Sequence, residues 1–168
     1  MKATSLGAVL TLSLLMAGCG KKAGPPGSTP SAAASVAEPV MTAWQQGDRS
    51  TAISSFLQTD WTSRPLFASS SALGLTEDQF KALSPAQQQA DSAEIYAQLE
   101  SLNELAKAVV QVGRDAAATG DKEQARKYFA SVKQFGGALS SPDCTRIVQL
   151  VGRAVVSMGD KELAKIGQ

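Results

Sequence analysis

Residues suited to catalysis are few in this 168-residue chain, and histidine is absent from it altogether. Catalytic triads, metal sites and general bases that depend on histidine are therefore excluded. Two acid pairs, Asp91 with Glu94 and Glu100 with Glu104, have the spacing that places both carboxylates on one helix face. A catalytic acid pair needs a cleft and a shifted pKa. We therefore interpret all four as solvated surface charges, and we expect no enzyme and no catalytic, metal-binding or cofactor-binding residue.

Cys19 carries the clearest chemical signal because of the residues that precede it. Lys2 is followed by an apolar run from about Leu6 to Met16, and the small residues Ala17 and Gly18 come directly before the cysteine. The run is shorter than the roughly 20 apolar residues that span a membrane. This layout resembles a bacterial lipoprotein signal peptide that ends in a lipobox. The resemblance implies cleavage before Cys19, a diacylglycerol thioether on its sulfur and acylation of the new amino terminus.

The lipobox also predicts where the protein resides. Lipid on Cys19 would anchor the chain in a bacterial cell envelope. Gly20 after the cysteine resembles the pattern that sorts enteric lipoproteins to the outer membrane, facing the periplasm. Residues 20–39 are rich in glycine, proline, serine and alanine. Such a segment cannot bury enough surface to order itself, so we expect a flexible, disordered tether.

Cys144 is the only other cysteine, and it has no partner for a disulfide within the chain once Cys19 is acylated. We predict a helix that begins at Ser141-Pro142, with Cys144 in its first turn. The helix dipole there favours a thiolate, which makes Cys144 a candidate for redox chemistry or for a disulfide between molecules. The alternative interpretation is a small, buried apolar residue.

Charged residues argue against nucleic acid as a partner and are sorted along the chain. Removing residues 1–18 takes away Lys2 and leaves 15 basic and 15 acidic residues, whereas nucleic-acid-binding domains are basic. Residues 77–104 hold six acids and one base, and residues 107–168 hold ten bases and six acids. These two groups either lie near each other on one solvated surface or form a charged docking face.

An internal repeat relates two segments that lie 39 residues apart. Val112-Gly113-Arg114, Gly120-Asp121-Lys122-Glu123 and Ala125 recur as Val151-Gly152-Arg153, Gly159-Asp160-Lys161-Glu162 and Ala164. A shorter copy surrounds Gly47-Asp48. In each copy we expect the glycine to end one helix and the aspartate to cap the next, which makes a helical hairpin. Gly113 and Gly152 would lie inside helices and let the helices carrying Ala125 and Ala164 pack closely.

These positions resemble the tetratricopeptide repeat, whose Leu-Gly, Gly-Asp, Ala and aromatic positions correspond to Val112-Gly113, Gly120-Asp121, Ala125 and Phe129. The chain departs from the family in lacking the aromatic residues of the first helix and the closing proline, and its period is longer. The resemblance implies helical hairpins that present a concave surface to peptides or partner proteins.

Apolar spacing and capping signals predict an all-α fold of antiparallel helical hairpins. A Thr-Glu-Asp-Gln capping box opens a short helix over 76–83, and a long amphipathic helix follows over 86–119. We predict further helices at 122–135, ended by Gly136-Gly137, and at 142–158. The inward-facing residues of the last helix are predicted to be Ile147, Leu150, Val151, Ala154, Val155 and Met158.

Aromatic residues mark the N-terminal part of the domain. An early hairpin over 40–58 would bury Trp44 and Phe56. The segment from Asp60 to Leu75 is predicted to be a partly ordered loop. Trp61 in this loop either folds back over the helix ends or stands exposed for recognition.

The sequence thus predicts a signal peptide at 1–18, a lipidated cysteine and linker at 19–39, and a helical repeat domain at 40–168. We expect a lipid-anchored envelope protein that acts as an interaction module or scaffold, bound to the membrane through Cys19 and to a protein partner. Two alternatives remain. One is a structural lipoprotein that self-associates into a homo-oligomer through its 86–119 helix. The other is an accessory subunit of an envelope enzyme, which would need a deep pocket lined by carboxylates.

Overall fold

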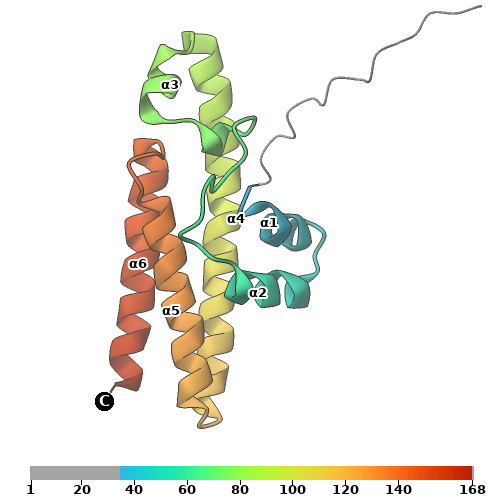
Figure 1. The fold of residues 1–168 in the computed structure, drawn as a ribbon, viewed down its shortest axis with the longest axis vertical. Coiled ribbons are helices and arrows are strands. Elements are labelled where there is room, and N and C mark those ends of the chain that lie inside the picture. Colours follow the sequence, from blue (N-terminus) through green and yellow to red (C-terminus); the bar gives the residue numbers. More distant parts are fainter. Residues whose placement is uncertain (1–34, 168) are drawn as a thin grey trace, which may run out of the picture. The chain divides into compact units, whose positions relative to one another are not determined.

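The computed structural model describes residues 35–167, which form a helical domain (Figure 1). Its elements are α1 (Glu38–Gln45), α2 (Arg49–Gln58), the 3-10 helix η1 (Ala72–Gly74), α3 (Glu77–Ala82), α4 (Pro85–Ala118), α5 (Lys122–Leu139) and α6 (Arg146–Ile166). No strand occurs within these residues, so the predicted all-α fold class is confirmed. None of the helices described is long and apolar enough to cross a membrane. The predicted signal peptide, Cys19 and the linker up to residue 34 lie outside the described residues.

The long helix α4 contacts most of the other elements. It begins with a capping box between Ser84 and Gln87 and carries Pro85 in its first turn. α5 and α6 pack along one side of α4, and α1 and α2 lie on another side (Figure 1). Most of the predicted apolar stripe of α4 is buried, namely Ile95, Leu99, Leu102, Leu105, Ala106, Val109 and Gly113. Val112 and Ala116, which the spacing also assigns to the stripe, are half-buried. The predicted helix over 86–119 is thus confirmed, and so is the short α3 with its capping box.

Two connections between helices use the same turn. Gly47 and Gly120 adopt left-handed φ angles of 79° and 91°, which glycine tolerates without a steric cost. The aspartate after each glycine caps the next helix: Asp48 and Asp121 each accept a hydrogen bond from the backbone N–H three residues later, at 3.0 and 2.9 Å. The predicted hairpins around these two turns are therefore present as α1–α2 and α4–α5.

The third predicted turn is wrong, although its four residues are identical to those of the second. Gly159-Asp160-Lys161-Glu162 lies inside α6, which continues to Ile166. A Cβ on Gly159 would come within 2.9 Å of the Phe129 carbonyl oxygen on α5, so this glycine allows close packing instead of ending a helix. Asp160 pairs with Lys133 Nζ at 2.8 Å and caps nothing. Packing against α5 overrides the local turn signal.

α5 also continues where a break is predicted, through Gly136-Gly137 to Leu139. A Cβ on Gly136 would lie 2.6 Å from the backbone nitrogen of Val156, and one on Gly152 would lie 2.7 Å from the Gly136 carbonyl oxygen. The two glycines therefore let α5 and α6 approach closely. The sequence predicts that Gly152 packs against a separate helix carrying Ala164. Gly152 packs against α5 at Gly136 instead, and Ala164 lies on the same helix as Gly152. Gly113 does act as predicted, since a Cβ there would lie 2.5 Å from the Phe129 ring.

α6 begins at Arg146 and not at Pro142, and its buried face differs from the predicted one. The Arg146 N–H donates to the Glu77 carboxylate of α3 at 2.8 Å, a contact that lowers the pKa of Glu77. The buried residues of α6 are Val148, Gly152, Val155, Gly159, Glu162 and Ile166. Of the six residues predicted to face inward, only Val155 is fully buried. The close contact of Gly152 and Gly159 with α5 accounts for this rotation.

The segment from Asp60 to Leu75 is a loop, as predicted, which contains η1 and packs onto the helices through its apolar residues. Trp61 is only 2% exposed, and its ring lies 4.8 Å from that of Phe56 and 4.7 Å from that of Phe135, between centroids. Its indole N–H donates to the Phe56 carbonyl at 3.1 Å. Trp61 therefore folds back, and the exposed alternative is wrong. Trp44 and Phe56 are buried as predicted.

Residues 35–37 belong to the packed domain, although the sequence assigns them to the linker. The N–H groups of Val36 and Ala37 donate to the carbonyls of Pro65 and Leu66, each at 3.0 Å. Ala37 is 1% exposed. Packing of the domain therefore extends to the N-terminal side of Val40.

Candidate functional site

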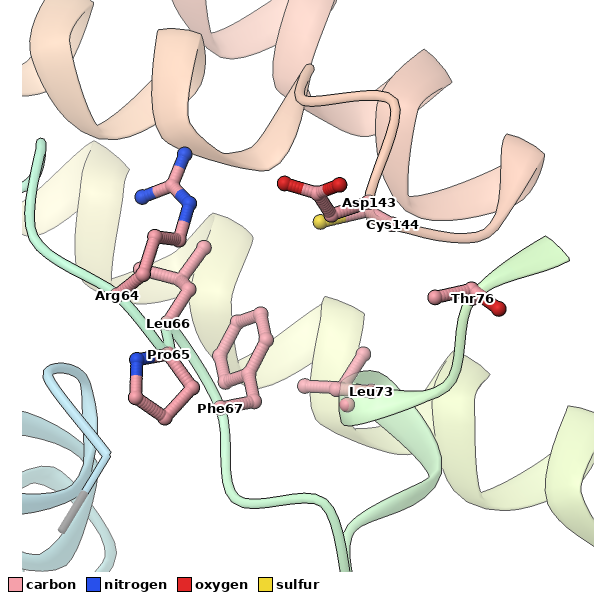
Figure 2. A pocket seen from close by; sticks show the side chains of 9 residues that line it. Arg64, Pro65, Leu66, Phe67, Leu73, Thr76, Asp143 and Cys144 are labelled. Carbon is pink, nitrogen blue, oxygen red and sulfur yellow. The ribbon is translucent and has the colours of Figure 1, made fainter. Parts of the chain in front are cut away.

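A cavity of about 470 Å³ lies between the segment at 64–76 and the turn that precedes α6 (Figure 2). Leu66, Phe67 and Leu73 give it an apolar wall, and Arg64 and Asp143 supply one charge of each sign. It also contains Cys144, which the sequence marks as a candidate for thiol chemistry. Arg64 comes from the segment after α2, whereas Asp143 and Cys144 come from the α5–α6 connection. The surroundings of Cys144 in this cavity therefore determine whether its thiol can react.

Cys144 is held as a buried thiol. It is 5% exposed, and burial raises its pKa, although the nearby Arg64 opposes that rise. A raised pKa keeps the thiol protonated and makes it a poor nucleophile. The residue precedes α6, so the prediction that it lies in the first turn of a helix is wrong. These features agree with the alternative interpretation of a small, buried apolar residue.

The two acid pairs lie on α4 without an enclosed setting. Glu94, Glu100 and Glu104 are exposed, and Asp91 is half-buried. Glu94 accepts a hydrogen bond from the Gln98 side chain at 2.6 Å. No cluster of three potential metal ligands occurs within residues 35–167. The geometry therefore does not equip these carboxylates as a catalytic pair.

The sequence prediction misses an ion pair between an exposed arginine of α4, Arg114, and a buried glutamate of α6, Glu162. Glu162 is 5% exposed and accepts from Arg114 at 2.5 Å and from Lys165 at 2.7 Å. The hydrogen bond from Arg114, with a smaller contribution from Lys165, lowers the pKa of Glu162 to about 2 against the opposing effect of burial. Its counterpart in the repeat, Glu123, is exposed, so the repeat itself carries no signal for this burial. The pair fixes how α4 and α6 align.

An apolar strip of α6 remains uncovered beside α4. It consists of residues predicted to point inward: Leu150 is 56% exposed, Ala154 is exposed, and Ile147, Val151 and Met158 are half-buried. They follow the spacing of a single helix face about 17 Å long. Tyr96 of α4, which is 61% exposed, is the only other exposed large apolar residue in the described part of the chain.

Tyr96 and the α6 strip border the same seam between parallel helices. Arg114 meets Glu162 towards the C-terminal ends of α4 and α6, and Ile95 and Ile147 line one cavity of about 200 Å³ towards their N-terminal ends. Tyr96 precedes Arg114 by five complete helical turns, so both lie on the side of α4 that faces α6. We define the α4–α6 face as Tyr96, Ile147, Leu150, Val151, Ala154 and Met158.

Charges of opposite sign border the α4–α6 face. On α4, Glu100 and Glu104 follow Tyr96 at intervals of four residues. On α6, Arg153 lies three residues after Leu150, and Lys161 lies three residues after Met158. All four are exposed, and none forms an ion pair within residues 35–167. The face thus has an apolar floor with one acidic edge and one basic edge.

Comparison of the chain with known protein families, curated proteins and solved structures finds no match. The functional argument therefore rests on the residues and geometry of this molecule.

Proposed function

We propose that this chain is a lipid-anchored protein of the bacterial envelope, held by a lipid on Cys19, that acts as a protein-interaction module through the α4–α6 face. The lipobox supports the lipid anchor. Gly20, which resembles the outer-membrane sorting pattern, supports a location in the outer membrane facing the periplasm. The interaction role is argued from the structure. Its main support is the exposure of Tyr96 and Leu150 beside one seam.

The energetics of these side chains favour a covered face. Fully burying a leucine contributes about 1.5–3 kcal/mol, and tyrosine combines a large apolar ring with a hydroxyl that tolerates partial hydration. Protein interfaces typically have aromatic and apolar residues at the centre and polar or charged residues at the rim. The face combines these features, with Tyr96 and Leu150 as its two most exposed apolar residues and Glu104 and Arg153 at its edges.

We further propose that the α1–α2 and α4–α5 hairpins are tetratricopeptide-like. Both use a left-handed glycine followed by a capping aspartate, and Ala52 and Ala125 are fully buried at equivalent positions. α6 forms no such hairpin of its own, so the proposed resemblance to tetratricopeptide repeats is limited to the α1–α2 and α4–α5 hairpins. Hairpins of this kind commonly bind proteins, which supports the interaction role by analogy of fold.

The proposal is tested by site-specific photo-crosslinking of the full-length chain in bacterial cells. A benzophenone amino acid replaces Leu150 in one variant. In the matched control it replaces Lys127, whose side chain is 62% exposed on α5. We expect a protein adduct from position 150 and none from position 127. Absence of any adduct at 150, or equal adducts at both positions, would contradict the interaction role.

The anchor is tested separately by membrane fractionation of Cys19→Ser. We expect this variant to leave the membrane fraction, and we expect the native chain to have the mass of residues 19–168 plus acyl groups. Retention of Cys19→Ser in the membrane, or an unmodified Cys19, would contradict lipidation without affecting the crosslinking result.

A further inference from the structure

We infer that the occupant of the α4–α6 face is a second copy of this chain, related by a twofold axis that runs parallel to α4 and α6. The inference rests on the proposed function, because it names the partner of the same face. It follows from three properties of that face: the parallel direction of its two helices, the places of its two exposed apolar residues, and the opposite charges of its edges.

The parallel direction of α4 and α6 limits how two copies can meet face to face. Arg114 pairs with a residue 48 positions later, and Ile95 shares a cavity with Ile147 at nearly the same offset. A residue of α4 is therefore level with the residue about 50 positions later on α6. A twofold axis along the helices places α4 of one copy against α6 of the other at the same level. An axis across the helices places α4 against α4 and α6 against α6.

The apolar residues fit the axis along the helices. Tyr96 is level with a point just before Leu150, so that axis brings the ring of Tyr96 against Leu150 and Ile147 of the second copy. The contact occurs twice in the dimer, because a twofold interface repeats every pair. Each copy then covers the two exposed large apolar residues of the other.

Charge decides between the two axes. With the axis along the helices, Glu100 and Glu104 on the acidic edge of one copy meet Arg153 on the basic edge of the other, and Glu104 and Arg153 are level within about one residue. Lys107, a base on the same side of α4, is level with Ser157 and meets no arginine. With the axis across the helices, acidic edge meets acidic edge and basic meets basic. Like charges placed opposite each other disfavour that arrangement.

The size of the face suits a dimer that forms on a membrane. The face is about 17 Å long and lies on two helices whose axes are about 8–10 Å apart. The area that it can bury is therefore smaller than the roughly 800 Å² per partner of a standard interface. We therefore expect weak association in dilute solution. Confinement of lipid-anchored copies to one membrane surface raises their effective concentration. The axis along the helices also places Ser35 of both copies at the same level along that axis, close to Gln98.

The test is disulfide trapping between two differently tagged full-length copies in bacterial membranes. One copy carries Tyr96→Cys and the other carries Leu150→Cys, so that a disulfide joining the two tags reports contact between α4 and α6 of different molecules. We expect this product to exceed, by at least fivefold, the dimers formed when either variant is expressed alone. Dominant dimers of Leu150→Cys alone would indicate the crosswise axis and overturn the inference.

A charge exchange at the edges tests the same geometry without new cysteines. We expect Glu104→Arg and Arg153→Glu each to weaken self-association about tenfold, and the double variant to restore it. Energy transfer between labelled copies in vesicles measures the association. Glu123→Arg on α5, at a side chain 81% exposed, is the matched control and should have no effect. Failure of the double variant to restore association would contradict the inference.

The outcomes separate this inference from the proposed function. An adduct at Leu150 that contains a different protein, with no disulfide between copies, would refute the dimer and leave the interaction role intact. Absence of both products would refute both claims.

Discussion

Adjacent glycines in α5 should respond in opposite directions to the same substitution. Gly136 is buried where α5 meets α6, and Gly137 is exposed on the other side of the helix. A Cβ on Gly136 would lie 2.6 Å from one backbone atom of α6 and 2.8 Å from another, whereas a Cβ on Gly137 has no neighbour within 4 Å. Gly136→Ala and Gly137→Ala therefore differ in packing and share the same gain in helix propensity.

The expected magnitudes follow from these contacts. Replacing glycine by alanine in an exposed helix stabilises by about 0.5–1 kcal/mol, which is the full expectation for Gly137→Ala. Gly136→Ala gains the same amount but forces two backbones apart, and overpacking of this kind costs about 1–3 kcal/mol. We expect a net loss of about 1–2 kcal/mol, so the two variants should differ by about 1.5–3 kcal/mol.

The assay is urea unfolding of the purified, unlipidated chain, followed by circular dichroism at 222 nm. The free energy of unfolding should rise for Gly137→Ala and fall for Gly136→Ala, with unchanged dependence on urea concentration. Equal stabilisation by both substitutions would show that α5 and α6 are not in close contact at Gly136. Destabilisation by both would show that α5 ends before these glycines, as the sequence predicts.

Three further predictions concern a cap, an ion pair and the aromatic cluster. Asp121→Ala should lower the free energy of unfolding by about 1 kcal/mol because it removes a helix cap. Asp160→Ala, in the identical tetrapeptide, should cost less than about 0.5 kcal/mol because it loses only an exposed ion pair; equal losses in urea unfolding would refute the difference. Because the folded-state pKa of Glu162 is depressed to about 2, the stability that Glu162 contributes is present above pH 4.5 and is lost as the pH falls through 2. The difference in unfolding free energy between the native chain and Glu162→Gln should therefore shrink over that range, and a constant difference would contradict this pairing. Trp61→Ala should cost about 3–5 kcal/mol, and a loss below 1 kcal/mol in the same unfolding assay would show that Trp61 is not packed in the core.

Local signals in the sequence predicted the elements whose formation depends on neighbours along the chain. The capping box at Thr76 and the turns at Gly47 and Gly120 are such cases, because their hydrogen bonds close within a few residues. The turn predicted at Gly159 failed because the fate of that tetrapeptide is decided by α5. A glycine that permits close packing and one that ends a helix look alike until the partner helix is known.

The candidate site could be predicted only in part, for the same reason. The apolar residues of α6 form two overlapping faces, and the choice between them depends on the glycine contacts with α5. The face containing Leu150 was predicted to be buried and is instead uncovered. Tyr96 lies off the buried stripe of α4, and nothing in its spacing shows that it borders α6. Cys19, in contrast, is predicted from a purely local pattern and lies outside the described residues.

The most direct test of the central claim is the accessibility of the α4–α6 face in isolated bacterial membranes. Leu150→Cys and, as control, Lys127→Cys are each labelled with a maleimide on membranes carrying the lipidated chain, and again on the dilute, unlipidated chain. If the face is covered by a partner, labelling at 150 should be at least tenfold slower than at 127 on membranes, and the two rates should be similar in dilute solution. Equal rates at both positions on membranes would show that the face is open and would contradict the account.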